Sequence, residues 1–213
     1  MANEQLYMTL EKMASAEFEE RNSIFIGHAA PIKSEEEAVA FIKQKQREFS
    51  DATHNVWAYL LGGGIVARYS DDGEPQGTAG VPVLECMRKS GATDMVVVVT
   101  RYFGGILLGA GGLVRAYSHA ARIALDAAHI ITYFKYGEYS MVCSYSDYQK
   151  FNLLLPKMRA LVDEVDYADC VTIRFAVRDE HREPLWRRIS EISNGKCEPE
   201  KTGERYDYHE IGE

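Results

Sequence analysis

The chain has 213 residues, of which 46% are hydrophobic and 26% are charged, so it is long enough for one large domain or two small ones. This composition excludes wholesale disorder, and no apolar run approaches the ~20 residues that cross a bilayer, so we expect no membrane contact. The 24 basic and 32 acidic side chains give a net charge of −8, which argues against broad, non-specific binding of nucleic acid.

The N-terminal residues and the cysteines favour a cytoplasmic protein. Residues 1–5 lack the basic start and the apolar core of a signal peptide. The four cysteines, at positions 86, 143, 170 and 197, form no CxxC pair, which predicts free thiols rather than a zinc site or a disulfide framework. We therefore expect no metal site and no cofactor.

Hydrophobic spacing and turn residues predict the elements of the first 136 residues. Ser34 and the three glutamates after it form a capping box that starts an amphipathic helix. The β-branched run Met95–Thr100 does not alternate with polar residues, so it is expected to be a strand covered on both faces. The other predicted elements are, in chain order, a strand or hairpin segment at Glu17–Ile26, a strand at Val56–Leu61 with a hairpin partner at Ile65–Tyr69, a short helix at Pro82–Lys89 and a buried, Ala-rich helix at Leu113–Ala128.

Composition divides the chain near residue 136, because 12 of the 17 glycines lie between Gly62 and Gly112. We expect an α+β protein of two domains, residues 1–136 and residues 137–213. The second domain is predicted to follow the order βαββαβ of the ferredoxin-like split motif. Its strands are expected at Tyr139–Tyr145, Asp163–Ala168, Val171–Val177 and Cys197–Tyr208.

The first candidate site is an acidic turn within Tyr69–Gly80, which carries the carboxylates of Asp71, Asp72 and Glu74. Three carboxylates in four residues suit a divalent cation, or a network that orients nearby arginines. A solvated turn, in which the aspartates bond their own backbone, is the structural alternative.

The second candidate site is a Gly-rich stretch, predicted as a strand that runs into a loop and then a helix. The predicted helix has no Ser, Thr, Asp or Asn at its start, so its first N–H groups favour an anion pocket. The two flanking arginines are suited to bidentate phosphate contacts. Tight packing of the strand against the helix would also require these glycines. The candidate ligand-binding residues are Arg101, Tyr102, Gly104, Gly105, Gly109, Gly111, Gly112, Arg115 and Tyr117.

His54 precedes a predicted core strand, where it is suited to be a general base, a phosphate contact or only a hydrogen-bond partner at the strand start. No Ser/His/Asp or Cys/His set has the spacing of an activated nucleophile, so no catalytic residue is predicted. We expect the acidic turn and the Gly-rich stretch to fold together into one recess.

These stretches resemble the bacterial YigZ branch of the IMPACT family. The resemblance is close over about residues 17–128, and the βαββαβ tail matches the second domain of bacterial members more loosely. The motifs that carry it are Asn22–Ile26, Ala52–Asn55, Ser70–Pro75, Gly77–Gly80, Arg101–Gly109 and Gly112–Tyr117.

The resemblance implies a first domain that contains a βαβ unit and has the fold of the second domain of a small-subunit ribosomal protein. This fold is shared with the last-but-one domain of elongation factor G and with sugar-type small-molecule kinases. The second domain is expected to be ferredoxin-like, similar to the last domain of elongation factor G. Eukaryotic relatives are similar to regulators of translation that act by binding proteins.

Two hypotheses follow. The first is a non-catalytic, translation-linked binding protein, whose motif surface holds a protein or a phosphate-bearing ligand and whose second domain contacts RNA, the ribosome or a translation factor. The second is an enzyme acting on a phosphorylated or nucleotide-like small molecule, with a cation on the acidic turn, phosphate on the Gly-rich amides and His54 as acid or base. We favour the first, because no nucleophile signature is present.

Overall fold

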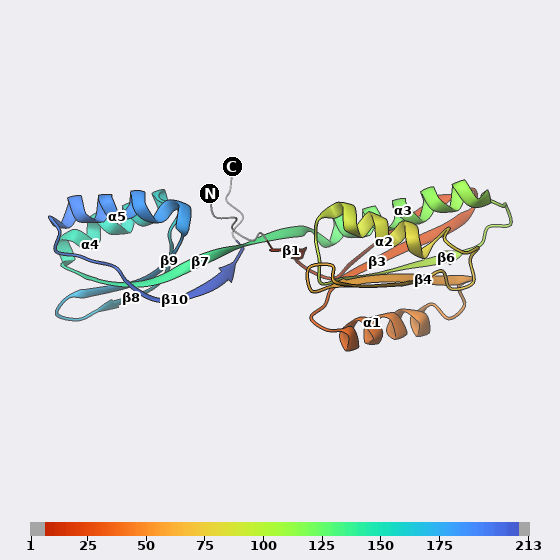
Figure 1. Cartoon of the computed structure of the whole chain (residues 1–213), viewed down its shortest axis with the longest axis horizontal. Helices are drawn as coiled ribbons and strands as arrows, with labels where there is room; N and C mark the ends of the chain where they lie inside the picture. The colour runs from red at the N-terminus through yellow and green to blue at the C-terminus, as the bar shows by residue number, and fades with distance from the viewer. Residues whose placement is uncertain (1–6, 209–213) are drawn as a thin grey trace. The chain divides into compact units, whose positions relative to one another are not determined.

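The computed structural model describes residues 7–208, so residues 1–5, on which the expectation about a signal peptide rests, lie outside it. The described chain is an α+β protein with two sheets and five helices (Figure 1). It forms two compact units, of which the first spans Tyr7–Thr132 and the second begins at Tyr133. The division therefore falls inside one long strand, β7 (Ile130–Cys143), whereas composition placed it after residue 136.

The first unit is built on a five-stranded antiparallel sheet of order β2-β3-β6-β4-β5. Strands β3 and β4 both run antiparallel to β6, which lies between them, so β3, α1 and β4 form a split βαβ unit. A short strand, β1 (Tyr7–Leu10), pairs with β7. The sheet strands are β2 (Ala14–Glu20), β3 (Ser23–Pro31), β4 (His54–Leu61), β5 (Val66–Ser70) and β6 (Met95–Tyr102).

Helices cover both faces of this sheet. Helix α1 (Glu35–Glu48) lies on one face, and α2 (Gly80–Ser90) and α3 (Gly109–Ala128) lie on the other (Figure 1). The run Met95–Val99 of β6 is fully buried, and its side chains alternate between the core under α1 and the core under α2 and α3. This confirms the expectation of a strand covered on both faces.

Helix α1 starts where its capping residue predicts, whereas α3 starts earlier than predicted. The Ser34 hydroxyl accepts a hydrogen bond from the backbone N–H of Glu37, as the capping box predicts. Helix α3, however, begins at Gly109 rather than Leu113. The expected Gly-rich loop is therefore partly the first turn of α3, because apolar spacing marks only the buried part of a helix and not its start.

The second unit has the predicted order of elements. Its strands pair antiparallel in the order β10-β7-β9-β8, which is the ferredoxin-like arrangement. Helices α4 and α5 bury a common core that includes Phe151, Phe175 and Leu185. After β7, its elements are α4 (Tyr145–Lys157), β8 (Leu161–Tyr167), β9 (Val171–Arg178), α5 (Asp179–Ser193) and β10 (Glu200–Asp207).

Candidate functional site

Asp71 fastens the acidic turn to the start of α2. Its carboxylate accepts hydrogen bonds from the backbone N–H groups of Gly77 (2.9 Å), Ala79 (3.1 Å) and Gly80 (2.8 Å). The side chain of Ala79 cannot cap α2, so Asp71 satisfies the amides of Ala79 and Gly80 from eight and nine residues upstream. The carboxylate thus stabilises the turn and the helix start together.

Asp72 holds the strand that carries His54. The Asp72 carboxylate accepts from the backbone N–H of Asn55 at 2.6 Å, and the Asp72 carbonyl lies 2.7 Å from Nδ1 of His54. A carbonyl oxygen can only accept, so Nδ1 must carry the proton. The opposite ring atom, Nε2, then faces Oε1 of Glu74 at 3.8 Å.

Glu74 lies at the centre of a buried network beneath α3. Its Oε1 atom contacts Nη1 of Arg101 at 2.5 Å and accepts from the hydroxyl of Tyr117 at 2.8 Å. The Glu74 and Arg101 side chains are only 4% and 6% exposed. Burial, reinforced by the charge of Glu74, raises the pKa of Tyr117 far above its usual value, so the phenol stays protonated and donates.

Arg101 is also packed between two aromatic rings. Its guanidinium carbon lies 5.4 Å from the centre of the Phe25 ring and 5.4 Å from that of Phe103. These are favourable cation–π distances. Its Nε atom is buried and has no hydrogen-bond partner among the described residues. The buried network of Glu74, Arg101 and Tyr117 therefore links the acidic turn, β6 and α3 inside the first unit.

The loop from β6 to α3 is fastened at its start. Tyr102 donates to Asp51 at 3.0 Å. A Cβ on Gly104 would lie 2.1 Å from the carbonyl carbon of Asn22, so only glycine allows the loop to pack on the β2–β3 turn. Gly105 follows with a left-handed backbone (φ +83°) and open space around it. The exposed apolar side chains of this loop are Phe103 (45%), Ile106 (46%) and Leu107 (81%).

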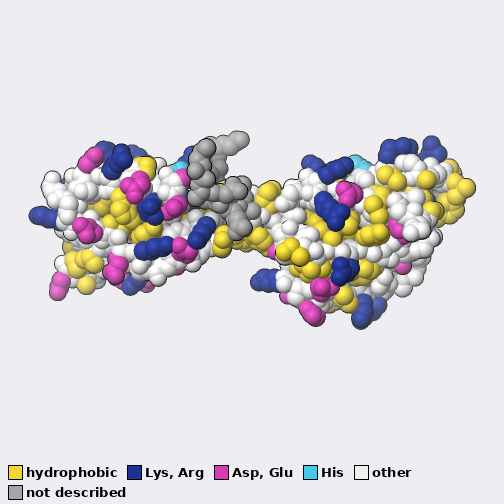
Figure 2. Space-filling view, in the orientation of Figure 1, with side chains coloured by type: hydrophobic (Ala, Val, Ile, Leu, Met, Phe, Trp, Pro, Cys, Tyr) yellow, Lys and Arg dark blue, Asp and Glu magenta, His cyan; other side chains and the backbone are white. Residues whose placement is uncertain are grey.

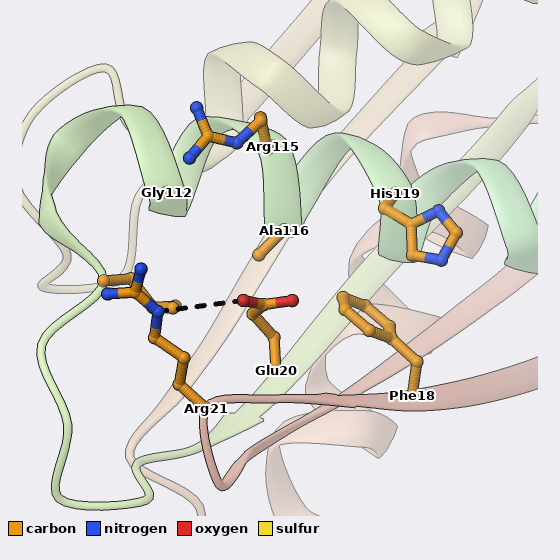
Figure 3. A pocket seen from close by; sticks show the side chains of 8 residues that line it. Phe18, Glu20, Arg21, Gly112, Arg115, Ala116 and His119 are labelled. Carbon is orange, nitrogen blue, oxygen red and sulfur yellow. Dashed lines mark ion pairs between the residues drawn. The ribbon is translucent and has the colours of Figure 1, made fainter.

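A pocket of about 250 Å³ lies between the start of α3 and the β2–β3 hairpin (Figure 3). Arg115 contributes to it, while Tyr117 points into the buried network, because positions two apart on a helix lie about 200° around its axis. The pocket lining, which we call the α3 pocket, is Phe18, Glu20, Arg21, Leu108, Gly112, Arg115, Ala116 and His119.

Comparison with known proteins places this architecture in a family. Residues 21–125 match the Impact N-terminal domain, and residues 141–196 match a domain of unknown function, DUF1949. The chain is 34% identical to the Bacillus subtilis protein named IMPACT family member YvyE over 193 residues, which cover 90% of this chain and 89% of the relative. The chain belongs to the IMPACT family.

Two further similarities extend over both units of this IMPACT family chain. The Escherichia coli protein named IMPACT family member YigZ is 33% identical over 181 residues, covering 84% of this chain and 89% of the relative. A solved structure titled "Crystal structure of an hypothetical protein" is 30% identical, covers 91% of this chain and 96% of its own, and superimposes with a TM-score of 0.58.

The structure divides the candidate residues of this IMPACT family member into two groups and a loop, where one recess was expected. The turn and network group contains His54, Asp71, Asp72, Glu74, Arg101 and Tyr117. Gly112 and Arg115 belong to the α3 pocket, and Gly111 lies beneath the Arg115 guanidinium. Tyr102 ends β6, and the loop between the two groups carries Gly104 and Gly105 and ends at Gly109, the first residue of α3.

Sequence reasoning missed the side of the α3 pocket formed by Phe18, Glu20 and Arg21, and His119 was not among the candidate residues. A signal was present on the helix, since Gly112, Arg115 and His119 follow helical spacing and share one face. No comparable signal marks the hairpin residues, because their approach to α3 depends on the fold of the sheet.

The acidic turn does not gather its carboxylates around one point. Asp71 accepts from amides, Asp72 from Asn55, and Glu74 contacts Arg101 and Tyr117. Within residues 7–208, no group of three or more His, Cys, Asp or Glu side chains has a geometry that could hold a metal ion. In the same part of the chain, no helix is long and apolar enough to cross a membrane.

Proposed function

We propose that this IMPACT family member is a cytoplasmic, non-catalytic binding protein linked to translation, and that its first unit carries the partner-binding surface. The proposal rests on one observation, which is that the carboxylates of the acidic turn contact groups of the protein itself. The carboxylates of Asp71 and Glu74 contact the protein's own amides, guanidinium and phenol, so they act as a scaffold. Such a scaffold positions a neighbouring surface rather than performing a reaction.

The surface that this scaffold positions is the loop from β6 to α3. Leu107 is 81% exposed on this loop, with Ile106 and Phe103 beside it. Figure 2 shows hydrophobic side chains gathered at the right-hand end of the first unit, where Figure 1 places the loop. A contiguous exposed apolar group on a fixed loop is typical of a macromolecular interface.

The second unit is less suited to binding phosphates through its arginines. Arg174 contacts Glu164 and Asp166, and Arg205 contacts Asp163 and Glu138. Each guanidinium thus faces at least two carboxylates, since Arg205 also contacts Asp207, and these carboxylates compete with a nucleic-acid backbone for it. On the face shown in Figure 2, basic and acidic side chains are interleaved over both units. For these reasons we assign the main contact to the first unit.

The link to translation rests on the family. The IMPACT resemblance implies regulators of translation among eukaryotic relatives and domains similar to two domains of elongation factor G. A ribosome, or a protein factor bound to it, is therefore the partner class that we propose. A protein contact through apolar side chains also agrees with the net charge of −8, which disfavours binding to bare RNA.

Sedimentation with purified ribosomes tests the proposal. We expect the full chain to pellet with ribosomes at low salt, and Leu107→Asp to reduce the retained fraction at least about fivefold, as for an interface anchor. The matched control is Ile65→Asp, because Ile65 is 89% exposed on the turn between β4 and β5. Absence of retention, or equal loss in the two variants, would contradict the proposal.

An enzyme acting on a phosphorylated or nucleotide-like molecule is the second candidate, and His54 is the observation that favours it. Its side chain is 20% exposed, and the Asp72 carbonyl fixes its orientation. The cation part of this candidate is weakened, because Asp71 and Glu74 are engaged elsewhere. Its test is a melting shift with Mg²⁺ plus nucleotide that Asp72→Ala and Arg101→Ala abolish.

A further inference from the structure

The α3 pocket contains charged side chains that the rest of the protein leaves available. Arg115 forms no hydrogen bond or ion pair with any described residue. Arg21 has only long contacts, 3.9 Å to Glu20 and 3.5 Å to the carbonyl of Leu107. By contrast Arg122, further along α3, contacts Asp126 at 3.0 Å. One guanidinium group at this cavity is thus unpaired and the other is held only by long contacts, so both can reach an anion.

The backbone at Arg21 supports the same conclusion. Arg21 and Asn22 form the two-residue turn between β2 and β3, and both have a left-handed backbone, with φ of +49° and +61°. Glycine or asparagine is favoured at such positions, whereas arginine is unfavourable. The turn therefore places the cationic side chain of Arg21 at the pocket although the left-handed backbone conformation is unfavourable for arginine.

The chemistry of the pocket changes from one end to the other (Figure 3). In this view the guanidinium groups of Arg21 and Arg115 lie toward the start of α3, and the rings of Phe18 and His119 lie at the opposite end. Those two rings form an edge-to-face pair with centres 4.6 Å apart. The carboxylate of Glu20 lies between the cationic end and the aromatic end.

The start of α3 adds to the cationic end. The N-cap residue, Leu108, makes no side-chain hydrogen bond to the helix, and the first turn carries no acidic side chain. The first N–H groups of the helix and its dipole therefore add positive potential beside Gly112. A dianionic group is favoured at this end, and a flat ring is favoured at the other.

We propose that the α3 pocket binds a ribonucleotide. Its phosphate contacts Arg21 and Arg115, its base packs against Phe18 and His119, and the Glu20 carboxylate accepts from the ribose hydroxyls. The volume of about 250 Å³ lies just below the roughly 300–1,000 Å³ of pockets for drug-sized molecules, so it limits the ligand to about one nucleotide and excludes a dinucleotide cofactor. No metal ion is required, since the guanidinium groups supply the positive charge.

This inference goes beyond the proposed ribosome contact and does not depend on it. A free nucleotide and the 5′-terminal nucleotide of an RNA present the same phosphate, ribose and base. A protein that sediments with ribosomes but binds no nucleotide would lose only the α3-pocket assignment. A protein that binds nucleotide but not ribosomes would lose only the proposed function.

Calorimetric titration of the full chain with AMP, GMP, CMP and UMP, in EDTA at low salt, tests the assignment. We expect saturable binding of at least one nucleotide, about tenfold weaker in Arg115→Ala, which corresponds to the loss of one charge-assisted contact. Arg122→Ala is the matched control on the same helix and should bind as the wild type does. Glu20→Gln should reduce the preference for the ribonucleotide over its 2′-deoxy form.

A second variant separates binding from folding. Arg21→Gly removes a guanidinium where the backbone favours glycine, so it should weaken binding while the melting temperature stays equal or rises. An oligoribonucleotide with and without a 5′-phosphate identifies the source of the ligand. Binding of the phosphorylated RNA alone would assign the pocket to RNA ends. No saturable binding of any probe, or equal loss in Arg122→Ala, would overturn the proposal.

Discussion

Two Arg–Glu pairs lie beside helix α3, and they differ in burial. Arg101 and Glu74 are 2.5 Å apart, with side chains 6% and 4% exposed. Arg21 and Glu20 are 3.9 Å apart, with side chains 57% and 51% exposed. The first pair is enclosed by Tyr117 and by aromatic rings, so its role is to hold the unit together. The second pair leaves its charges to solvent or to a ligand. Residue type therefore does not separate scaffold from site, and burial does.

The largest expected effect comes from breaking the buried pair. Glu74→Gln would leave the Arg101 guanidinium buried without a counter-charge and should lower the free energy of unfolding by about 3–5 kcal/mol. Denaturant unfolding followed by circular dichroism measures it. Glu20→Gln makes the same chemical change in the exposed pair and should leave stability nearly unchanged. Similar losses in the two variants would refute the comparison.

A second prediction concerns pH, through another buried polar group of the first unit. His28 is 2% exposed, its Nδ1 lies 2.7 Å from the hydroxyl of Ser15, and burial, with a smaller effect of Lys45, lowers its pKa to about 4. In the unfolded chain the His28 imidazole is protonated near pH 6.5, whereas in the folded chain it remains neutral down to about pH 4. The free energy of unfolding should therefore fall between pH 6.5 and pH 4, by about 3 kcal/mol in all.

Unfolding curves across this pH window check the assignment to His28. His28→Leu removes the group that titrates, so the dependence of stability on pH should flatten in this range. His119→Leu is the matched control, because it removes an exposed histidine and should retain the slope. If the free energy of unfolding still depends steeply on pH in His28→Leu, groups other than His28 cause the dependence.

The smallest expected effects concern the exposed pair. Arg21→Gly should raise the free energy of unfolding by about 1 kcal/mol, because glycine adopts the left-handed backbone at φ +49° without steric cost. Arg115→Ala, in the same pocket, should change it little, since the side chain has no partner among the described residues. Denaturant midpoints measure both. A marked loss of stability in Arg21→Gly would place Arg21 in the scaffold.

Local elements were predictable where their signals are local. Ser34 caps α1 as its capping box predicted, because cap chemistry acts within a few residues. The unbroken apolar run of β6 predicted burial on both sides. The order βαββαβ predicted the ferredoxin-like sheet, and the motif spacing predicted the family.

The grouping of the site residues was not predictable in the same way. Glu74 and Arg101 are 27 residues apart, and they meet because β4 and β6 pair and α3 covers them. From the sequence we could predict that the acidic turn orients nearby arginines. We could not predict that the arginine is Arg101 and not Arg115. Arg21 reaches the α3 pocket only because β2 packs against α3, which is a property of the tertiary structure.

Strand β7 sets a practical limit on how the protein can be divided for study. The boundary between the two units falls after Thr132, yet the strand continues to Cys143 and pairs with both β9 and β10. A fragment that stops at the unit boundary would remove the first three residues of this strand from the second unit. A fragment that continues to residue 143 would expose backbone groups that normally pair, and such bare edges promote aggregation. Failure of a fragment that ends within residues 134–143 to remain in solution would then reflect the broken strand pairing, not whether that half can fold.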